Sequence, residues 1–228
     1  MTKEKVPENY DPTKFNRPSV TVDMIIFTIK DDDLKVLLVN RDEDPFKGYW
    51  ALPGGFIKMD ESLDNSAKRI LERETGVTNV YLEQLYTFGE PERDPRTRVI
   101  TICYFAIVNS DEVEISDDVN VKWFSIYDLP DLAFDHNDIA KYAHKRLRWK
   151  LGYTPAVFSF LPEKFTLTEL QRVYEIVFNK KFDKRNFRKK VKKINLVKET
   201  GERKEDVSHR PPRLYKANKD PDEIVEII

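Results

Sequence analysis

The chain of 228 residues contains a single cysteine, Cys103. One cysteine excludes an internal disulfide framework and suits a reducing compartment. Long apolar runs are also missing: no segment approaches the roughly 20 residues that a membrane-spanning helix needs. The polar N-terminus lacks the pattern of a signal peptide, and there are no internal repeats or low-complexity tracts. We therefore expect a soluble, cytoplasmic protein without membrane association.

The net charge is only −1, but the charges are distributed unevenly. Residues 180–210 contain 13 Lys or Arg and 5 Asp or Glu, a net charge of +8. Residues 211–228 carry −1, so residues 1–179 carry −8. Such a division predicts two parts with different tasks. The basic part is the candidate for binding a polyanion, and the acidic part is a poor one.

A spaced motif occupies residues 55–77. It reads Gly, five residues, Glu, seven residues, Arg, and then an aliphatic residue before Glu-x-Gly-aliphatic. The matching positions are Gly55, Glu61, Arg69, Leu71, Glu74, Gly76 and Val77. Residues 63–75 contain no Gly or Pro and have apolar residues at helical spacing, which predicts a helix that starts near Ser62 and stops at Gly76.

This motif resembles the Nudix box, and the glycine pair at 54 and 55 strengthens the resemblance to that family. The family pattern has two further acids, where this chain has Ile70 and Arg73. The resemblance implies that acids at positions 70, 73 and 74 share one helix face and hold Mg²⁺ against a diphosphate. Only Glu74 remains, so we expect no metal, no cofactor and no efficient hydrolysis. An ordinary surface helix of mixed charge is the alternative.

The rest of the first part alternates strands and helices around this motif. Residues 1–18 are predicted to be an extended arm. Strands are predicted at 20–29, 34–39, 81–89, 98–108 and 121–126, with an amphipathic helix at 136–151. Strands that enclose one helix and precede another match the α/β mixed-sheet sandwich of the Nudix fold. We place this domain at residues 19–152.

The remaining residues, 153–228, have the pattern of a winged helix-turn-helix domain. An apolar, proline-containing hinge at 153–165 precedes a helix at 167–178, and Thr166 and Glu169 have capping-box spacing at its start. Asp183 precedes a second helix that extends to about residue 194. Two strands are predicted at 196–199 and 213–217, on either side of a charged tip at 200–212. The final segment, 220–228, is compatible with a strand or a dimer contact.

The second helix carries seven basic residues and no acid between positions 184 and 193. Lys and Arg neutralise phosphates, and Arg and Asn read base edges from the N-terminal part of such a helix. The predicted base readers, each of which is equally able to clamp a phosphate, are Arg185, Asn186 and Arg188. The other predicted DNA contacts are Thr168, Gln171, Lys184, Lys189, Lys192, His209 and Arg210. A solvated charged face is the alternative, and RNA is disfavoured because the basic part lacks an aromatic stacking sheet.

A decayed Nudix box before a helix-turn-helix with the core LTELQRVYEIVFNKKFDKRNFRKKV is similar to the Nudix-related transcriptional regulators of the NrtR type, from about Ser19 to Ala217. The resemblance implies a Nudix domain that senses a metabolite and a symmetric homodimer that binds a palindromic double-stranded DNA operator. The chain looks most similar to the AraR branch, a group of repressors of sugar-utilisation genes in which L-arabinose releases DNA. An ADP-ribose-responsive regulator of NAD metabolism is the alternative.

The loops beside the box supply candidates for the effector pocket, which are Lys47, Trp50, Tyr86, Glu90, Arg93 and Arg98. A neutral sugar needs hydrogen-bonding groups and an apolar wall. Core packing is an equally good explanation for Trp50 and Tyr86, as are salt bridges for Arg93 and Arg98. Coupling to DNA is expected through residues 136–165. Two other classes stay open: a Nudix hydrolase acting on a nucleoside diphosphate derivative, and an adaptor whose Nudix part only dimerises.

Overall fold

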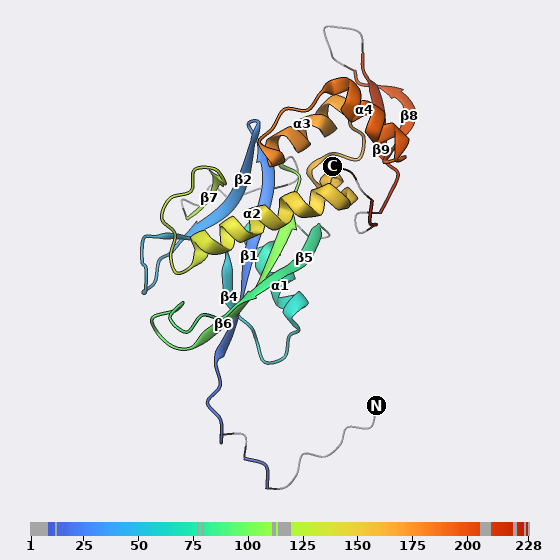
Figure 1. The fold of residues 1–228 in the computed structure, drawn as a ribbon. Helices are drawn as coiled ribbons and strands as arrows, with labels where there is room; N and C mark the ends of the chain where they lie inside the picture. The colour runs from blue at the N-terminus through green and yellow to red at the C-terminus, as the bar shows by residue number, and fades with distance from the viewer. Residues whose placement is uncertain are drawn as a thin grey trace.

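The computed structural model describes residues 9–11, 13–76, 78, 80–110, 113, 120–205, 211–220, 223–225 and 227. Within these residues, a seven-stranded mixed sheet carries α1 on one face and α2 on the other, and a smaller helical domain with a two-stranded sheet follows (Figure 1). This is the Nudix α/β fold followed by a winged helix domain, as the sequence predicts. The described residues of the N-terminal arm are exposed and lie outside the sheet.

The strands of the large sheet are β1 (Ser19–Lys30), β2 (Asp33–Asn40), β3 (Trp50–Ala51), β4 (Gly54–Phe56), β5 (Tyr81–Phe88), β6 (Val99–Ile107) and β7 (Val121–Ser125). The central order is β3-β2-β1-β6-β5, with β4 paired to β1 and β7 paired to β2. β1 and β6 are parallel, and the other pairs are antiparallel. The short strands β3 and β4 lie in a segment that the sequence analysis left unassigned.

The two faces of the sheet follow from the alternation of side chains along buried strands. On β1, Met24 and Ile26 pack toward α1, whereas Ile25 and Phe27 pack toward α2. Cys103 on β6 is fully buried in the α2-side core, and burial raises the pKa of its thiol. A central strand that is buried on both faces has the near-continuous apolar sequence seen in residues 22–27.

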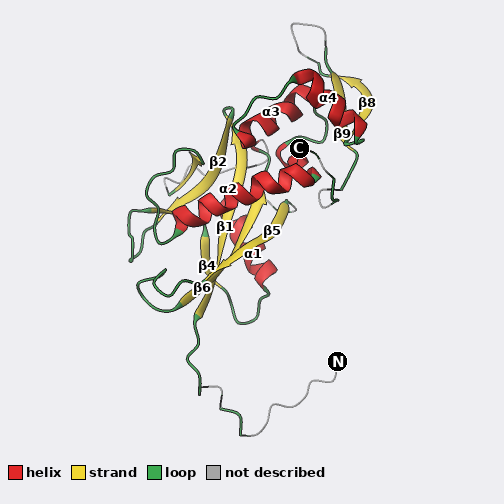
Figure 2. Ribbon diagram, viewed as in Figure 1, coloured by secondary structure: helices red, strands yellow, loops and turns green. Residues whose placement is uncertain are grey.

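The box helix α1 (Leu63–Thr75) begins and ends where the sequence predicts. The Ser62 hydroxyl accepts a hydrogen bond from the Asn65 backbone N–H, and Gly76 closes the helix at a φ of 68°, in the left-handed region that favours glycine. α2 (His136–Tyr153) crosses the opposite face of the sheet (Figure 2). No helix in the described part of the chain combines the length and apolarity that crossing a membrane requires.

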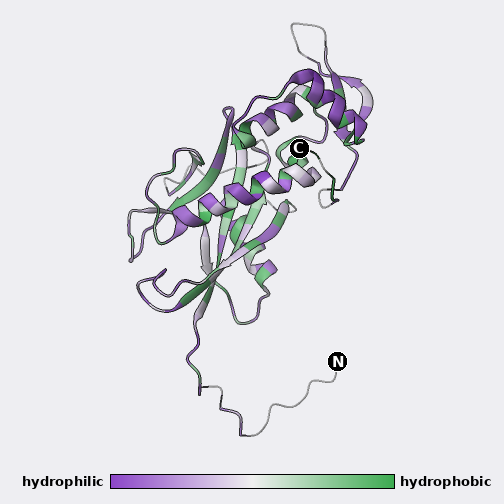
Figure 3. Cartoon of the chain, in the orientation of Figure 1, coloured by the Kyte–Doolittle hydropathy of each residue, from purple (hydrophilic) through white to green (hydrophobic). Residues whose placement is uncertain are grey.

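The second domain contains the 3₁₀ helix η2 (Pro155–Phe160), α3 (Leu167–Phe178), α4 (Lys184–Lys193), β8 (Val197–Arg203) and β9 (Arg213–Ala217). The capping box of Thr166 and Glu169 is present in full, and Asp183 accepts from the Asn186 N–H at the start of α4. β8 and β9 pair in antiparallel fashion and form the wing. Figure 3 shows that α4 is predominantly hydrophilic, while apolar residues concentrate on the strands of the large sheet.

Candidate functional site

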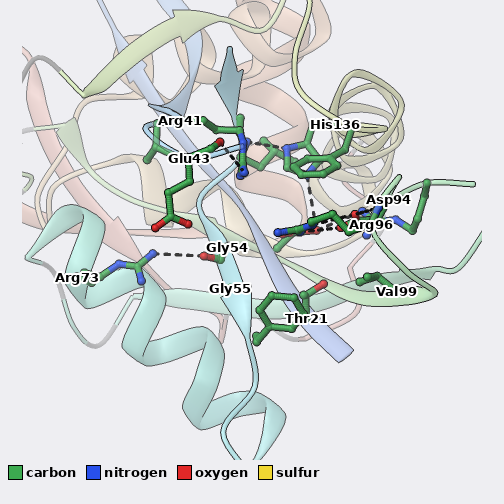
Figure 4. Close-up of a pocket in the computed structure, with 17 residues that line it drawn as sticks. Thr21, Arg41, Glu43, Gly54, Gly55, Arg73, Asp94, Arg96, Val99 and His136 are labelled. Carbon is green, nitrogen blue, oxygen red and sulfur yellow. Dashed lines mark hydrogen bonds and ion pairs between the residues drawn. The ribbon is translucent and has the colours of Figure 1, made fainter. Parts of the chain in front are cut away.

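A cavity of about 220 Å³ lies where β1, β4 and the loop before β6 approach α1 and the start of α2 (Figure 4). Its lining combines arginines, acids and aromatic side chains with the glycine pair that precedes the box. The lining residues are Thr21, Asp23, Val39, Arg41, Glu43, Ala51, Leu52, Gly54, Gly55, Phe56, Arg73, Arg93, Asp94, Arg96, Val99, Phe134 and His136.

A buried ion-pair network forms the inner wall of the cavity. The Arg93 guanidinium, only 4% exposed, donates to both carboxylate oxygens of Asp135 at 2.7 and 2.9 Å. Its Nη2 also lies 3.4 Å from Asp23 Oδ2. Removing one partner of such a buried network leaves an uncompensated charge and typically costs about 3–5 kcal/mol. Arg93 therefore fixes the segment before α2 against β1.

His136 lies in the same wall and is neutral. The Leu52 N–H donates to His136 Nδ1 at 2.9 Å, so the neutral imidazole carries its proton on Nε2, which lies 3.8 Å from Asp23 Oδ2. Burial lowers the pKa of His136, although the nearby Asp23 carboxylate opposes this shift. The ring thereby holds the first turn of α2 against the loop between β3 and β4.

Gly54 brings the backbone of β4 close to the buried acid. A Cβ atom at position 54 would lie 2.2 Å from Asp23 Oδ1 and 3.0 Å from the Val22 carbonyl oxygen. No side chain fits at that distance, so the approach requires glycine. Gly54 thus shapes the cavity before the box helix begins, whereas a Cβ at Gly55 would meet no atom within 4 Å.

Three further arginines, Arg41, Arg73 and Arg96, reach the cavity from separate segments (Figure 4). The guanidinium carbons of Arg41 and Arg96 lie 4.9 and 5.7 Å from the centre of the Phe134 ring. Phe134 has a φ of 56°, a left-handed conformation that costs a bulky residue about 1–3 kcal/mol and that concentrates at functional sites. Guanidinium groups bind phosphate oxygens in bidentate fashion, so this lining suits a phosphorylated ligand.

Two of these arginines are held in place by acids. Arg96 donates to both oxygens of Asp94 at 2.8 and 3.0 Å, and this hydrogen bonding holds the pKa of Asp94 below its usual range. Arg73 Nη2 lies 3.4 Å from the Gly54 carbonyl oxygen, and its Nε donates to Glu74 at 2.6 Å. The cationic groups are therefore preorganised around the cavity.

The box keeps its scaffold but not the donors of a magnesium site. Arg69 forms a bidentate pair with Glu61, whose pKa this hydrogen bonding lowers to about 2. Ile70 is fully buried in the core between α1 and the sheet. With Arg73 paired to Glu74, the donor set does not fit a divalent cation, which needs several free oxygen ligands. Within the described residues, no cluster of three His, Cys, Asp or Glu side chains is placed to hold a metal.

Of the predicted pocket residues, the structure brings only Arg93 to this cavity. The partly buried Trp50 packs edge-on against Phe124, and Tyr86 packs against Phe88 on β5 and Tyr142 on α2. The exposed Arg98 donates to the Gly89 carbonyl at 2.5 Å. The two remaining candidates, which are exposed loop residues outside the cavity lining, are Lys47 and Glu90.

Most of the cavity lining is not predicted from the sequence, notably Arg41, Arg96, Phe134 and His136. A usable signal was present for Arg96, because the segment RDPRT places two arginines around a proline in one charged loop. The isolated Phe134 and His136 gave no such signal, since only the packing of the α2 start against β1 and β4 brings them to the cavity.

The predicted DNA contacts divide into exposed and internally bonded groups. The predicted contacts that are exposed on α4 are Lys184, Arg185, Asn186, Lys189 and Lys192, and the helix also exposes Lys190 and Lys193. Arg188 is half-buried and donates through Nη2 to Thr168 Oγ1 at 3.0 Å. Gln171 donates to Glu175 and to the Phe182 carbonyl, so its amide N–H groups stabilise the turn between α3 and α4. His209 and Arg210 lie outside the described residues.

Comparison with known families and proteins gives matches to both parts of the chain. Residues 18–147 match the NUDIX domain, and residues 157–217 match the NrtR DNA-binding winged helix domain. The chain is 38% identical over 213 residues to the ADPR responsive transcriptional repressor NtrR of Acinetobacter baylyi, covering 91% of this chain and 85% of that protein. It is also 37% identical to an ADP-ribose pyrophosphatase of Methanocaldococcus jannaschii, over 65% of this chain and 86% of that enzyme.

Solved structures of Shewanella oneidensis NrtR are similar across the same two parts. The complex with a 27mer DNA superposes with a TM-score of 0.81 at 39% identity, covering 89% of this chain and 94% of that chain. The NUDIX domain of that protein in complex with ADP ribose superposes with a TM-score of 0.54 at 43% identity, covering 61% of this chain and 94% of that chain. With the two domains in this order, and with a full-length relative at this identity, the chain belongs to the NrtR family of Nudix-related transcriptional regulators.

Proposed function

We propose that this protein is a DNA-binding transcriptional repressor whose Nudix domain binds ADP-ribose without hydrolysing it. The observation that carries this proposal is the cavity beside the box helix, which four arginines line. A diphosphate supplies the oxygen atoms that guanidinium groups bind. A cavity of about 220 Å³ encloses part of a ligand of this size, and we assign the diphosphate to it.

The lining favours ADP-ribose over L-arabinose. A neutral pentose has no charge that would complement four guanidinium groups, whereas a diphosphate does. The Acinetobacter relative is named for its response to ADP-ribose, and the Shewanella NUDIX domain was crystallised with that ligand. These relatives support the ADP-ribose alternative and give no support to the arabinose branch.

The winged helix domain supplies the second half of the proposal. Its helix α4 presents exposed basic side chains, and the Shewanella relative of the same architecture was crystallised with DNA. A homodimer with recognition helices about 34–36 Å apart would meet successive major grooves of a palindromic operator. Such a regulator acts in the cytoplasm, where the operator DNA is accessible.

The route from the cavity to the DNA-binding domain runs along α2. Asp135 is the N-cap residue of α2, but its carboxylate pairs with Arg93 and makes no cap hydrogen bond. Farther along α2, His144 Nε2 donates to the Val177 carbonyl near the end of α3 at 3.3 Å. A ligand that engages Arg93 therefore changes the support of a helix that also contacts α3, and its differential affinity for the two arrangements sets the size of the effect.

A hydrolase is the second candidate function, because the chain resembles an ADP-ribose pyrophosphatase over its Nudix part. The box helix argues against hydrolysis, because Ile70 is buried in the core and Arg73 occupies the position of a metal-binding acid. Incubation with ADP-ribose and Mg²⁺ tests this directly. Turnover at ordinary enzyme rates, above about 1 per second, would replace the sensor with an enzyme.

The binding half of the proposal is tested by thermal unfolding of the whole protein with ADP-ribose or L-arabinose, each in EDTA and in Mg²⁺. A ligand at 100 times its Kd stabilises the folded state by about 2.7 kcal/mol. We expect ADP-ribose to raise Tm equally with and without Mg²⁺, and L-arabinose to leave Tm unchanged. A shift with arabinose alone would reverse the effector assignment. DNA binding is tested by selecting duplexes from a random-sequence pool and measuring their release by ADP-ribose.

A further inference from the structure

The C-terminal segment returns to the end of α2. The Val225 N–H donates to the Tyr153 carbonyl at 2.8 Å, and the Ile227 N–H donates to the Gly152 carbonyl at 2.9 Å. The last carbonyls of a helix have no partner within the helix and must be satisfied from elsewhere. Two alternate residues of the segment thus cap α2, the helix that begins at the arginine-lined cavity.

The same segment contacts α4. The Ile227 side chain is 3% exposed and belongs to the core of the DNA-binding domain. It lines a mainly apolar cavity of about 200 Å³ together with Phe182, Asn186, Phe187, Lys190 and Val191. Phe187 and Val191 are the buried residues of α4. Ile227 therefore packs beneath the helix that carries the predicted DNA contacts.

The start of the segment is anchored at the turn that follows the C-terminal end of α4. After β9, the Asn218 N–H donates to the Leu196 carbonyl at 3.1 Å, and its side-chain amide donates to the Asn195 carbonyl at 3.0 Å. The described residues 218–220, 223–225 and 227, which we call the C-terminal strap, thus join the end of α4 to the end of α2. In Figure 1 the strap (dark red) runs beside α2 and below α4.

α4 is otherwise supported from α3, through contacts such as the edge-on packing of Tyr174 against Phe187 at 5.6 Å. The strap adds a direct connection between α4 and α2. The capped carbonyls and the buried Ile227 are therefore the contacts through which a shift of α2 would reach α4. α3 alone would leave the tilt of α4 relative to α2 less constrained.

We propose that the C-terminal strap positions α4 relative to α2, and that Ile227 is the positioning residue for DNA binding. This inference rests on the proposed function, because it assigns the strap a role in the response of DNA binding to ADP-ribose. In this proposal Ile227 contacts neither ADP-ribose nor DNA. α2 lies between Ile227 and the arginine-lined cavity, and α4 lies between Ile227 and the predicted DNA contacts.

The chain offers a matched control in Ile224, which is the same residue type in the same segment and is 81% exposed. The experiment compares Ile227→Asp, Ile227→Val and Ile224→Asp in the full chain. ADP-ribose affinity is measured by calorimetry. DNA affinity is measured with and without ADP-ribose on a duplex that the wild-type protein selects from a random-sequence pool.

We expect Ile227→Asp to lower DNA affinity at least tenfold and to shrink the ratio of affinities measured with and without ADP-ribose. ADP-ribose affinity should stay within twofold of wild type, because the cavity lies at the other end of α2. Ile227→Val should restore both DNA readouts to within about twofold, and Ile224→Asp should match wild type throughout.

Two outcomes would overturn the inference. Wild-type DNA affinity and response in Ile227→Asp would remove the positioning role, and an equal loss of ADP-ribose affinity would make Ile227 a residue of general stability. A failure of the proposed function is distinguishable, because the wild-type protein would then select no duplex or bind no ADP-ribose, and the role of the strap would fall with it.

Discussion

Arg73 and Glu74 occupy adjacent positions of the box helix, and their side chains pair at 2.5 Å. In the Nudix box pattern both positions carry acids, which together attract a divalent cation. Here the guanidinium neutralises the remaining acid and lies at the edge of the cavity. Arginine in place of an acid removes one oxygen ligand of a cation and adds N–H donors of the kind that bind phosphate oxygens. We infer that Arg73 supplies the charge that a metal supplies in the hydrolases.

Arg73→Glu should lower ADP-ribose affinity in EDTA by about 10- to 100-fold, equivalent to about 1.4–2.8 kcal/mol. The reason is that the variant replaces an attractive charge by a repulsive one beside the assigned diphosphate. Calorimetry measures the change, and Arg98→Glu is the control because Arg98 is exposed and lies outside the cavity lining. Equal affinities of Arg73→Glu and wild type would remove Arg73 from the site.

His136 predicts a pH dependence of stability. Burial lowers its pKa below the ordinary value of 6.5. The unfolded chain takes up a proton near pH 6.5, whereas the folded chain resists protonation until a lower pH. The contribution of His136 is therefore fully present above pH 6.5 and falls as the pH drops below it, by up to about 1.4 kcal/mol per pH unit.

His136→Asn should flatten this dependence between pH 6.5 and 5. The Asn oxygen can still accept from the Leu52 N–H, but the side chain has no proton to take up. Urea unfolding at several pH values measures the slope. His144, whose pKa burial also lowers, is present in both proteins and leaves a residual slope. An unchanged slope would show that His136 takes up its proton at the same pH in the folded protein as in the unfolded chain.

On the scale of single elements, α4 separates residues that hold the domain together from residues that face solvent. Arg188 bonds to Thr168 at the start of α3, and its buried Nε has no hydrogen-bond partner among the described residues. Arg188, predicted as a base reader, is thus already engaged within the domain. The Asn186 and Lys189 side chains are exposed on the same helix. These two are the better tests of base and phosphate contact.

Asn186→Ala should weaken binding to the selected duplex by about 1–3 kcal/mol and relax specificity at one position. Lys189→Ala should weaken binding to all duplexes alike and reduce the salt slope by about 1, because a phosphate contact releases counterions. Fluorescence anisotropy at several salt concentrations separates the two. Lys141→Ala, on the exposed surface of α2, is the control. A sequence-independent loss in Asn186→Ala would make it a phosphate contact.

On the scale of the whole molecule, polar contacts connect the Nudix part to α3. The Tyr127 hydroxyl donates to the Ile176 carbonyl at 2.6 Å, next to the contact between His144 and Val177. Arg172 on α3 pairs with Asp32 in the turn between β1 and β2 at 2.8 Å. These contacts lie along α3 from Arg172 in its middle to Val177 near its end, so they set how the DNA-binding domain sits on the sheet.

Tyr127→Phe removes one of these contacts and keeps the ring. We expect a loss of about 0.5–1.5 kcal/mol in the free energy of unfolding, together with a smaller effect of ADP-ribose on DNA affinity. ADP-ribose affinity itself should not change. Tyr86→Phe, at a ring that is 53% exposed on the Nudix part, is the control. A full ADP-ribose effect in Tyr127→Phe would place the coupling elsewhere.

The residue pattern alone predicted most elements, and for local reasons. The bounds of α1, α3 and β9 were predicted to the residue, because helix caps and apolar periodicity are encoded within a few positions. The two domains followed from the box spacing and from the two helices before a wing. Even the replacement of box acids by Ile70 and Arg73 is visible without coordinates.

The lining of the cavity was decided only by the tertiary structure. Its buried network joins Asp23 to Arg93, 70 positions apart, and Leu52 to His136, 84 positions apart. No local rule brings such pairs together, because their contact depends on the parallel register of β1 and β6 and on how α2 starts beside β4. The course of the C-terminal strap has the same origin: Ile224 and Ile227 are chemically identical, and only the packing of the strap against the end of α2 and against α4 buries one and exposes the other.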